Sequence, residues 1–226
     1  MRRLLQRVCR WAFTLGLLLL LGPIPLVLAL RVFEPPTTTM MLARTIERFL
    51  QAKRPFYPRR QPVPMARISP HLRHAVLAAE DDRFYLHSGF DFQEIARALD
   101  DHDRGKPLRG ASTISQQTAK NLFLWQGRSF LRKGLEAYLT VILETLLPKD
   151  RILEIYLNLA EWGDGIFGAE AAAHAYFAKP AAALWRDEAA RMAAVLPNPR
   201  EWEPHDAVAW RRARRILERM AQQVEH

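Results

Sequence analysis

The residues best suited to chemistry lie in one stretch, residues 75–91, where an apolar helical run ends in a polar segment. Two adjacent carboxylates stand at that point, Glu80 and Asp81, and an aromatic ring and an imidazole follow, Phe84 and His87. A carboxylate at the end of a buried helix loses water, which raises its pKa toward the range useful for moving protons. A helix end with ordinary solvated acids would give the same pattern.

A second polar stretch, residues 110–117, reads Gly-Ala-Ser-Thr-Ile-Ser-Gln-Gln. Thr113 and Gln116 have the spacing of a capping box, so a helix should begin here. Four polar side chains then share one helix face, because they are three or four residues apart: Thr113, Gln117, Lys120 and Asn121. Ser112, Lys120 and the free N-terminus of this helix are suited to hold a phosphate or a sugar hydroxyl. A well-capped surface helix is the alternative.

The third stretch with chemical potential is Arg132-Lys-Gly-Leu-Glu136. Arg132 and Lys133 are four and three residues before Glu136, so all three heads gather on one side of a helix. An ordinary helix salt bridge of a few tenths of a kcal/mol would explain the spacing. A cationic cluster for a diphosphate, with the acid orienting the bases or helping to hold a metal ion, would explain it too.

Several helices must position these groups. Ser69-Pro70 predicts a helix start, with serine as the cap and proline at the first helical position. Asp91 should cap a helix that runs to about Leu99, and the polar residues 100–110 indicate a mobile loop. Asp150 is expected to cap the next helix, residues 151–158. No strand of clear alternation is present, although a short hairpin in a connector stays open.

The later part of the chain also reads as helical. The glycine-containing loop 163–168 precedes an alanine-rich helix, and the run 187–199 predicts a helix that Pro197 stops. The tail, residues 208–223, is a basic amphipathic helix that should pack on the domain or lie against anionic lipid. We expect these segments to act mainly as scaffold.

The 226-residue composition favours one mostly helical domain behind a membrane segment. The hydrophobic fraction is 49%, enough for a sizeable core, and the net charge of +9 indicates an acidic partner such as nucleic acid, anionic lipid or a phosphorylated substrate. The single cysteine, Cys9, precedes the apolar run, which argues against cysteine catalysis and cysteine metal sites.

The N-terminus predicts a retained membrane anchor. Residues 1–10 form a basic tail, and residues 11–30 carry no charge over about twenty residues, which as a helix span roughly 30 Å. The basic tail should stay in the cytoplasm. A cleaved signal peptide is the alternative, but no clear A-x-A processing site follows the run.

The proline-rich residues 31–66 are expected to form a juxtamembrane connector, leaving residues 67–226 as the domain. A merely solvated linker would have a similar composition. Six basic residues of the connector are candidates for contact with lipid headgroups: Arg44, Arg48, Lys53, Arg54, Arg59 and Arg60.

Together, these stretches resemble a known family. Glu80-Asp81-x-x-Phe84-x-x-His87-x-Gly89-x-Asp91 resembles the first motif of the peptidoglycan glycosyltransferases, the domain shared with class A penicillin-binding proteins. Residues 110–117, 132–136, 152–158 and 188–199 are similar to the second to fifth motifs, in order. The chain ends soon after the fifth and carries no Ser-x-x-Lys acylation motif, so we expect a monofunctional member without a transpeptidase domain.

The resemblance implies a mostly α-helical, lysozyme-like glycosyltransferase domain with a smaller membrane-facing lobe, preceded by one transmembrane helix. It implies lipid II and the growing glycan chain as substrates, at the periplasmic face of the bacterial inner membrane. Membrane lipids and other cell-wall or division proteins are further expected partners. Nucleic acid is not expected, because the domain lies outside the cytoplasm.

The resemblance also implies roles for individual residues. Glu80 and Glu136 would be the catalytic pair, with Glu80 as general base and Glu136 orienting the cations or sharing a divalent ion such as Mg²⁺ or Mn²⁺ at the diphosphate. No cofactor is certain. The expected substrate-binding residues are Asp81, Phe84, His87, Ser112, Thr113, Gln116, Gln117, Lys120, Asn121, Arg132 and Lys133.

Two other functions fit parts of the pattern. A lytic, lysozyme-like glycosidase would use two acids in a helical cleft, but it would have no diphosphate for the cations to bind. A membrane-anchored cell-wall scaffold with a degenerate site would not need a suitable residue at every catalytic position.

Overall fold

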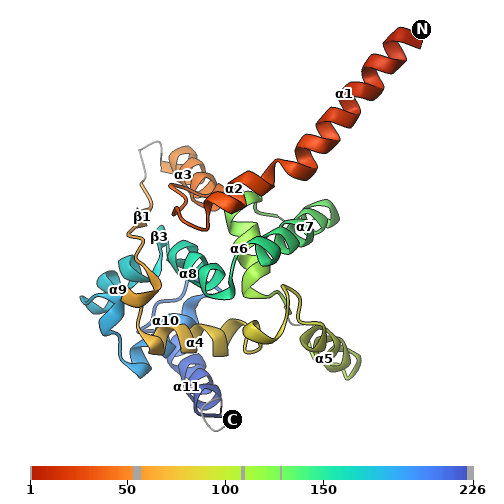
Figure 1. Cartoon of the computed structure of the whole chain (residues 1–226). Helices are drawn as coiled ribbons and strands as arrows, with labels where there is room; N and C mark the ends of the chain where they lie inside the picture. The colour runs from red at the N-terminus through yellow and green to blue at the C-terminus, as the bar shows by residue number, and fades with distance from the viewer. Residues whose placement is uncertain (1, 53–56, 108–109, 128, 223–226) are drawn as a thin grey trace.

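The computed structural model describes residues 2–52, 57–107, 110–127 and 129–222. Its helices are α1 (Arg2–Leu21), α2 (Pro23–Ala29), α3 (Thr39–Ala52), α4 (Pro70–Glu80), α5 (Phe92–Asp103), α6 (Ile114–Phe123), α7 (Phe130–Leu146), α8 (Lys149–Leu159), α9 (Ala169–Phe177), α10 (Arg186–Val195) and α11 (Ala207–Gln222). Short 3-10 turns lie at Met65–Arg67, Phe84–Leu86 and Ala181–Ala183. The mostly helical prediction is confirmed (Figure 1).

A small three-stranded sheet holds the only strands among the described residues. Its strands are β1 (Arg59–Arg60), β2 (Glu161–Gly163) and β3 (Ile166–Phe167), in the order β1-β3-β2. β2 and β3 form an antiparallel hairpin, and β1 pairs with β3 in parallel. The strands are too short to show an alternating pattern of apolar and polar residues. The sequence therefore predicts no strand and only leaves a short hairpin open.

Two packed groups of helices form the core. α4 packs on α10 and α11, and α6 packs on α7 and α8. α4 starts as predicted, because the Ser69 side chain accepts the backbone N–H of His71 and Pro70 fills the first turn. Its apolar face, with Leu72 and Val76 fully buried, faces the core and leaves Glu80 at its C-terminal end.

Two predicted helix boundaries were wrong. α5 continues to Asp103, so residues 100–103 are helical rather than loop; the Arg104 and Gly105 N–H groups then close its end on backbone carbonyls. Residues 108–109 of that expected loop lie outside the described residues. α8 begins at Lys149 with Pro148 as its cap, and the Asp150 carboxylate instead accepts a hydrogen bond from the Tyr85 hydroxyl at 2.8 Å.

The predicted anchor is helical but breaks near its far end. Cys9–Ala29 is long and apolar enough to cross a membrane, and α1 extends away from the body (Figure 1). The break falls at Gly22, before the two prolines of α2. α2 then packs on α7, and its Val27 side chain is fully buried. The end of the apolar segment is therefore part of the folded body.

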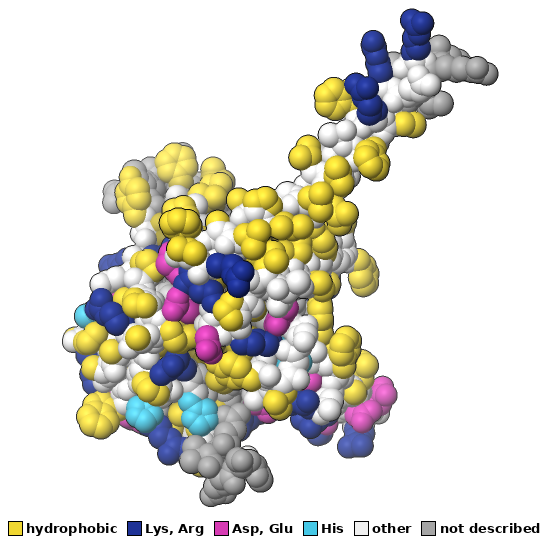
Figure 2. Space-filling model, viewed as in Figure 1, with side chains coloured by type: hydrophobic (Ala, Val, Ile, Leu, Met, Phe, Trp, Pro, Cys, Tyr) yellow, Lys and Arg dark blue, Asp and Glu magenta, His cyan; other side chains and the backbone are white. Residues whose placement is uncertain are grey.

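Residues 31–66 contain more structure than a connector requires. Arg151 on α8 donates hydrogen bonds to the carbonyls of Leu30 (2.7 Å) and Phe33 (3.0 Å), just after the anchor. α3 packs on α6. Its outer face exposes four large apolar side chains: Leu42, Ile46, Phe49 and Leu50. Figure 2 shows hydrophobic side chains gathered at the top of the body, where Figure 1 places α3.

Two basic side chains expected at lipid headgroups point inward instead. Arg44 on α3 forms an ion pair with Glu161 of β2 at 2.6 Å, and the Glu161 side chain is almost fully buried. Arg60 donates to the Asn158 carbonyl and pairs with Glu34. Because buried charges need partners, these arginines fix residues 31–66 to the body. Lys53 and Arg54 lie outside the described residues.

We predict that Arg44→Ala lowers the free energy of unfolding by about 3–5 kcal/mol, because it leaves the Glu161 carboxylate buried without its cation. The control is Arg48→Ala on the same helix, whose ion pair with Asp164 is well exposed and is worth less than about 1 kcal/mol. Chemical unfolding in detergent measures both. Equal, small losses of unfolding free energy in both variants would show that the Arg44–Glu161 ion pair does not stabilise the fold.

Candidate active site

Three helices bring together the groups around Glu80. The carboxylate stands at the end of α4, and the Gln117 side chain of α6 donates a hydrogen bond from Nε2 to Glu80 Oε2 at 3.0 Å. The Tyr156 hydroxyl of α8 in turn donates to Gln117 Oε1 at 3.2 Å. The partly buried acid is therefore held from one side, by a donor whose own position is fixed.

Burial raises the pKa of the Glu80 carboxyl above its ordinary value. The hydrogen bond from Gln117 and the positive charges of Arg212 and Lys120 oppose that rise, and the neighbouring Asp81 adds to it. A carboxylate of this kind takes a proton more readily than a solvated acid. Sequence reasoning missed Arg212 because it appeared only as one of several arginines in the basic tail.

The predicted cationic cluster is present on α7. Arg132 Nη1 lies 2.6 Å from Glu136 Oε2, and Lys133 Nζ lies 2.5 Å from Glu136 Oε1, while the Glu136 side chain is only 3% exposed. Lys133 also donates to the Ser112 hydroxyl at 3.3 Å. Both carboxylate oxygens of Glu136 thus serve to orient the two cations.

Lys120 lies within the electrostatic reach of both groups. Burial lowers the pKa of its ammonium, and the nearby Arg132 and Lys133 lower it further, while Glu136 and Glu80 raise it. The Lys120 charge therefore links the Glu80 end of the site to the cationic cluster. In a partly desolvated site, the Lys120 charge acts strongly on any anion bound between Glu80 and the cationic cluster.

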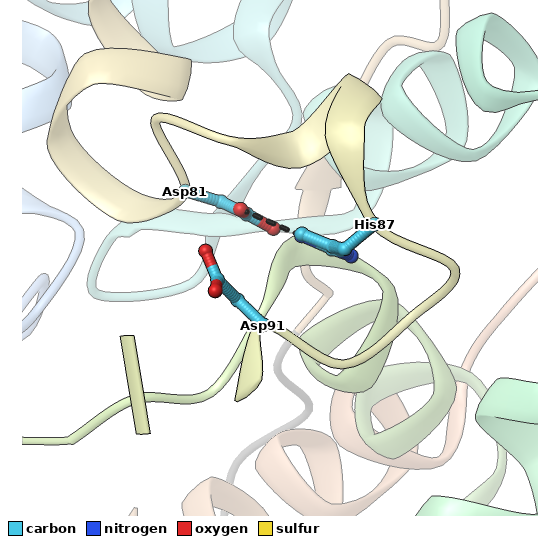
Figure 3. A group of neighbouring side chains, drawn as sticks. All are labelled: Asp81, His87 and Asp91. Atoms are coloured by element: carbon cyan, nitrogen blue, oxygen red, sulfur yellow. Dashed lines mark hydrogen bonds and ion pairs between the residues drawn. The ribbon is translucent and has the colours of Figure 1, made fainter. Parts of the chain in front are cut away.

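Three side chains of the first motif lie close together: Asp81, His87 and Asp91 (Figure 3). The Gly89 N–H donates to His87 Nδ1 at 3.1 Å, so the ring proton is on Nε2, which donates to Asp81 Oδ1 at 2.9 Å. Asp91 accepts the backbone N–H of Glu94 and caps α5. Among the described residues, this is the group whose ligand atoms lie close enough for a metal ion, but its hydrogen bonds leave the imidazole no lone pair to offer.

Gly89 allows this loop to lie against α7. Its φ of +91° is unfavourable for other residues, and a Cβ there would lie 2.8 Å from Thr140 Cγ2. Phe84, 1% exposed, lies under the Lys149 ammonium at 4.3 Å from the ring centroid. The first motif therefore combines the partly buried Glu80 carboxylate with several residues that support its loop.

The expectation of a free helix N-terminus at α6 was wrong. The Ile114 N–H donates to Asp81 Oδ2 at 2.9 Å, so a protein carboxylate occupies the place expected for a phosphate. The capping box is confirmed, with the Thr113 side chain bound to the Gln116 N–H and the Gln116 side chain bound to the Thr113 N–H. Thr113 also donates to the Gly89 carbonyl at 2.7 Å.

Other predicted residues differ in what they face. Asn121 is buried on α6, where α3 packs, and its Oδ1 has no hydrogen-bond partner among the described residues. Ser112 is exposed and lies where the cationic cluster meets the open cleft. Gln117 and Lys120 lie close to Glu80, and Arg132 and Lys133 belong to the cationic cluster.

A cleft of about 960 Å³ opens beside Glu80. Its walls come from the end of α4, from α5, from residues 110–113 and from the end of α11, which contributes Arg219 and Gln222. Glu80 and Ser112 both line it, whereas Arg132 and Lys133 lie beyond its lining. The arrangement offers one base between an open cleft and a group of cations, which suits transfer of a group away from an anionic leaving group.

Comparison with known proteins agrees with this geometry. The family described as "Transglycosylase" matches residues 46–221. A biosynthetic peptidoglycan transglycosylase of Ectopseudomonas mendocina (strain ymp) is 50% identical over 224 residues, covering 98% of this chain and 90% of that protein. Proteins of the same name from Xanthomonas campestris pv. campestris (strain B100) and Pseudomonas fluorescens (strain SBW25) are 46% and 51% identical, covering 97% and 87% of this chain and 89% and 82% of their own lengths.

The family match begins within α3 and ends within α11, so it includes every element that contributes to the site. The expected fold class, a mostly α, lysozyme-like domain with one apolar helix before it, is confirmed. The chain belongs to the transglycosylase family of peptidoglycan glycosyltransferases.

Proposed function

We propose that the protein polymerises lipid II into β-1,4-linked glycan strands and releases undecaprenyl diphosphate. The observation that carries this proposal is the position of Glu80, a desolvated carboxylate with one fixed donor, within electrostatic reach of Lys120, which also interacts with the cationic cluster on α7. The relatives' name, biosynthetic peptidoglycan transglycosylase, supports the substrate class. Lys120, Arg132 and Lys133 supply cations at the site, and the diphosphate of lipid II is anionic.

Glu80 acts as the general base in this proposal. It takes the proton from the 4-hydroxyl of the acceptor's N-acetylglucosamine as that oxygen bonds to the anomeric carbon of the donor's N-acetylmuramic acid. The bond from that carbon to the diphosphate breaks, and undecaprenyl diphosphate leaves with the electron pair. Attack opposite the leaving group inverts the α-linked donor to a β bond. A diphosphate is stable as an anion, so the site needs one base and no second acid.

The cations stabilise the charge that develops on the leaving diphosphate. Arg132, Lys133 and Lys120 have this role, because oriented cations contribute most in a site of low dielectric. Glu136 orients Arg132 and Lys133 rather than binding a metal ion, since both of its oxygens already face these two side chains. Ser112, Gln117 and Asn121 position the sugar and diphosphate.

The remaining predicted site residues support this machinery. Asp81 and His87 tie the end of α4 to the start of α6, Thr113 and Gln116 cap α6, and Phe84 packs beneath the loop. Their polar atoms are engaged within the protein, so we assign them to positioning rather than to direct substrate contact.

In this proposal the apolar helix holds the site at the membrane that carries the substrate. The basic tail keeps the N-terminus in the cytoplasm, which puts the domain in the periplasm, single-pass in the inner membrane. The apolar face of α3 lies against the bilayer, where it contacts membrane lipids. Other cell-wall or division proteins are further partners in this proposal.

The lytic alternative is less well supported by the geometry. A glycosidase needs two working carboxyl groups. The carboxylate next to Glu80 is Asp81, whose oxygens accept the Ile114 N–H and the His87 ring proton, and Glu136 is held by its two cations. Shortening of purified sacculi in place of elongation of lipid II would favour that alternative.

We predict that Glu80→Gln lowers polymerisation of lipid II in detergent by about 10²–10⁴-fold, the usual contribution of a general base. The exposed Glu218→Gln on α11 is the matched control and keeps wild-type turnover. Near-normal turnover by Glu80→Gln would exclude Glu80 as the base.

The same variant should be more stable than the wild type at neutral pH. Because the folded-state pKa of Glu80 is raised, its charge costs stability as pH rises through that value, and the cost is absent below the ordinary glutamate pKa. Thermal unfolding across pH measures this: the midpoint of Glu80→Gln lies above wild type at pH 7.5, and the difference closes on acidification. A lower midpoint at pH 7.5 would show that the carboxylate stabilises the fold.

For Glu136→Gln we expect a drop of about 10–100-fold in transfer rate, because the amide no longer neutralises and orients both cations. Titration with Mg²⁺ or Mn²⁺ should leave the ratio of variant to wild type unchanged. A ratio that changes with the metal concentration would instead assign Glu136 to a metal site.

A further inference from the structure

Tyr156 is a buried tyrosine that the catalytic scheme does not yet use. It lies on α8, is 2% exposed, and is among the largest fully buried side chains. A phenylalanine would serve for packing alone, and a buried hydroxyl without a partner costs free energy. Here the hydroxyl has a partner in the site itself, Gln117 Oε1 at 3.2 Å.

The hydrogen bond from Tyr156 sets which end of the Gln117 amide faces Glu80. With the amide oxygen toward the hydroxyl, the NH₂ group faces Glu80 Oε2 at 3.0 Å. A rotated amide would place its oxygen against the carboxylate, which is repulsive while Glu80 is ionised. The order Tyr156 to Gln117 to Glu80 therefore gives every donor an acceptor and suits the charged form of the base.

We infer that Tyr156 is a positioning residue of the transfer reaction, acting on Glu80 through the amide of Gln117. This inference rests on the proposed role of Glu80 as the base. Two hydrogen bonds between side chains, Tyr156 to Gln117 and Gln117 to Glu80, join α8, α6 and α4. The fourth motif, which contains Tyr156, then has a part in the chemistry in addition to its packing.

Three charged groups also act on Glu80 and must stay constant in any test. They are Asp81 beside it, Lys120 on α6 and Arg212 on α11. Arg212 is fixed separately, by a hydrogen bond to the Ala194 carbonyl at 3.1 Å. Burial keeps the Tyr156 hydroxyl protonated by raising its pKa well above the ordinary value, so it is a neutral donor throughout. Removing this hydroxyl changes no charge.

The test is the pH dependence of lipid II polymerisation by Tyr156→Phe in the full-length protein in detergent. Without the hydrogen bond from Tyr156, the Gln117 amide stabilises the Glu80 carboxylate less. The acid limb of the pH–rate profile should therefore move to higher pH by about half a unit to one unit. At pH values well above the acid limb, the polymerisation rate of Tyr156→Phe should stay within about threefold of wild type. Tyr176→Phe on α9 is the control, because it removes a hydroxyl bonded to the Trp162 carbonyl, and its limb should not move.

A second variant tests the route through the amide and does not depend on Tyr156→Phe folding well. Gln117→Met removes both hydrogen bonds with little change in size, and its acid limb should shift in the same direction. In the double variant, Tyr156→Phe should add no further shift, since the residue through which it acts is gone.

Three results would overturn the inference: an unmoved acid limb in Tyr156→Phe, an equal loss of rate at every pH, or a full additional shift in the Gln117→Met background. Each of these leaves the proposed base intact if Glu80→Gln is inactive. An active Glu80→Gln would instead remove the proposed function of Glu80, so the two failures are distinguishable.

Discussion

The site depends on one carboxylate that is desolvated and yet surrounded by groups that favour its charged form. Burial alone would drive Glu80 toward its neutral form, and full hydration would make it a weak base. The fold resolves this conflict by placing one hydrogen-bond donor, Gln117, and two cations, Lys120 and Arg212, around the end of α4. Much of the surrounding structure can be understood as what is needed to hold these groups in place.

The two helix groups of the core meet at this carboxylate. α4 carries it and packs with α10 and α11, which bring Arg212. α6 carries the donor and the lysine, and packs with α7 and α8, which bring the Arg132 cluster and Tyr156. The Asp81 carboxylate joins the groups directly by accepting the first N–H of α6. The apolar segment docks on the same two helices, α2 on α7 and the Leu30 carbonyl on Arg151 of α8, so it is fixed to the group that carries the cations.

The sequence predicted the parts of the site that depend on local spacing. The Ser69 cap, the capping box at Thr113 and the Glu136 cluster are all interactions within a few residues along a helix, and all three are confirmed. The Gln117–Glu80 contact, the position of Arg212 and the occupied N-terminus of α6 join residues far apart in the chain, and spacing carries no information about them. The sequence places α3 in a connector for the same reason, since its buried ion pair with Glu161 joins residues 117 positions apart.

The most direct test is the titration of Glu80 itself, followed by the ¹³C signal of its side-chain carboxyl and assigned by its loss in Glu80→Gln. If Glu80 is the desolvated base of the reaction, its midpoint lies above that of an ordinary glutamate and coincides with the acid limb of the polymerisation rate. A midpoint at the ordinary value, or one that does not coincide with that limb, would contradict the assignment.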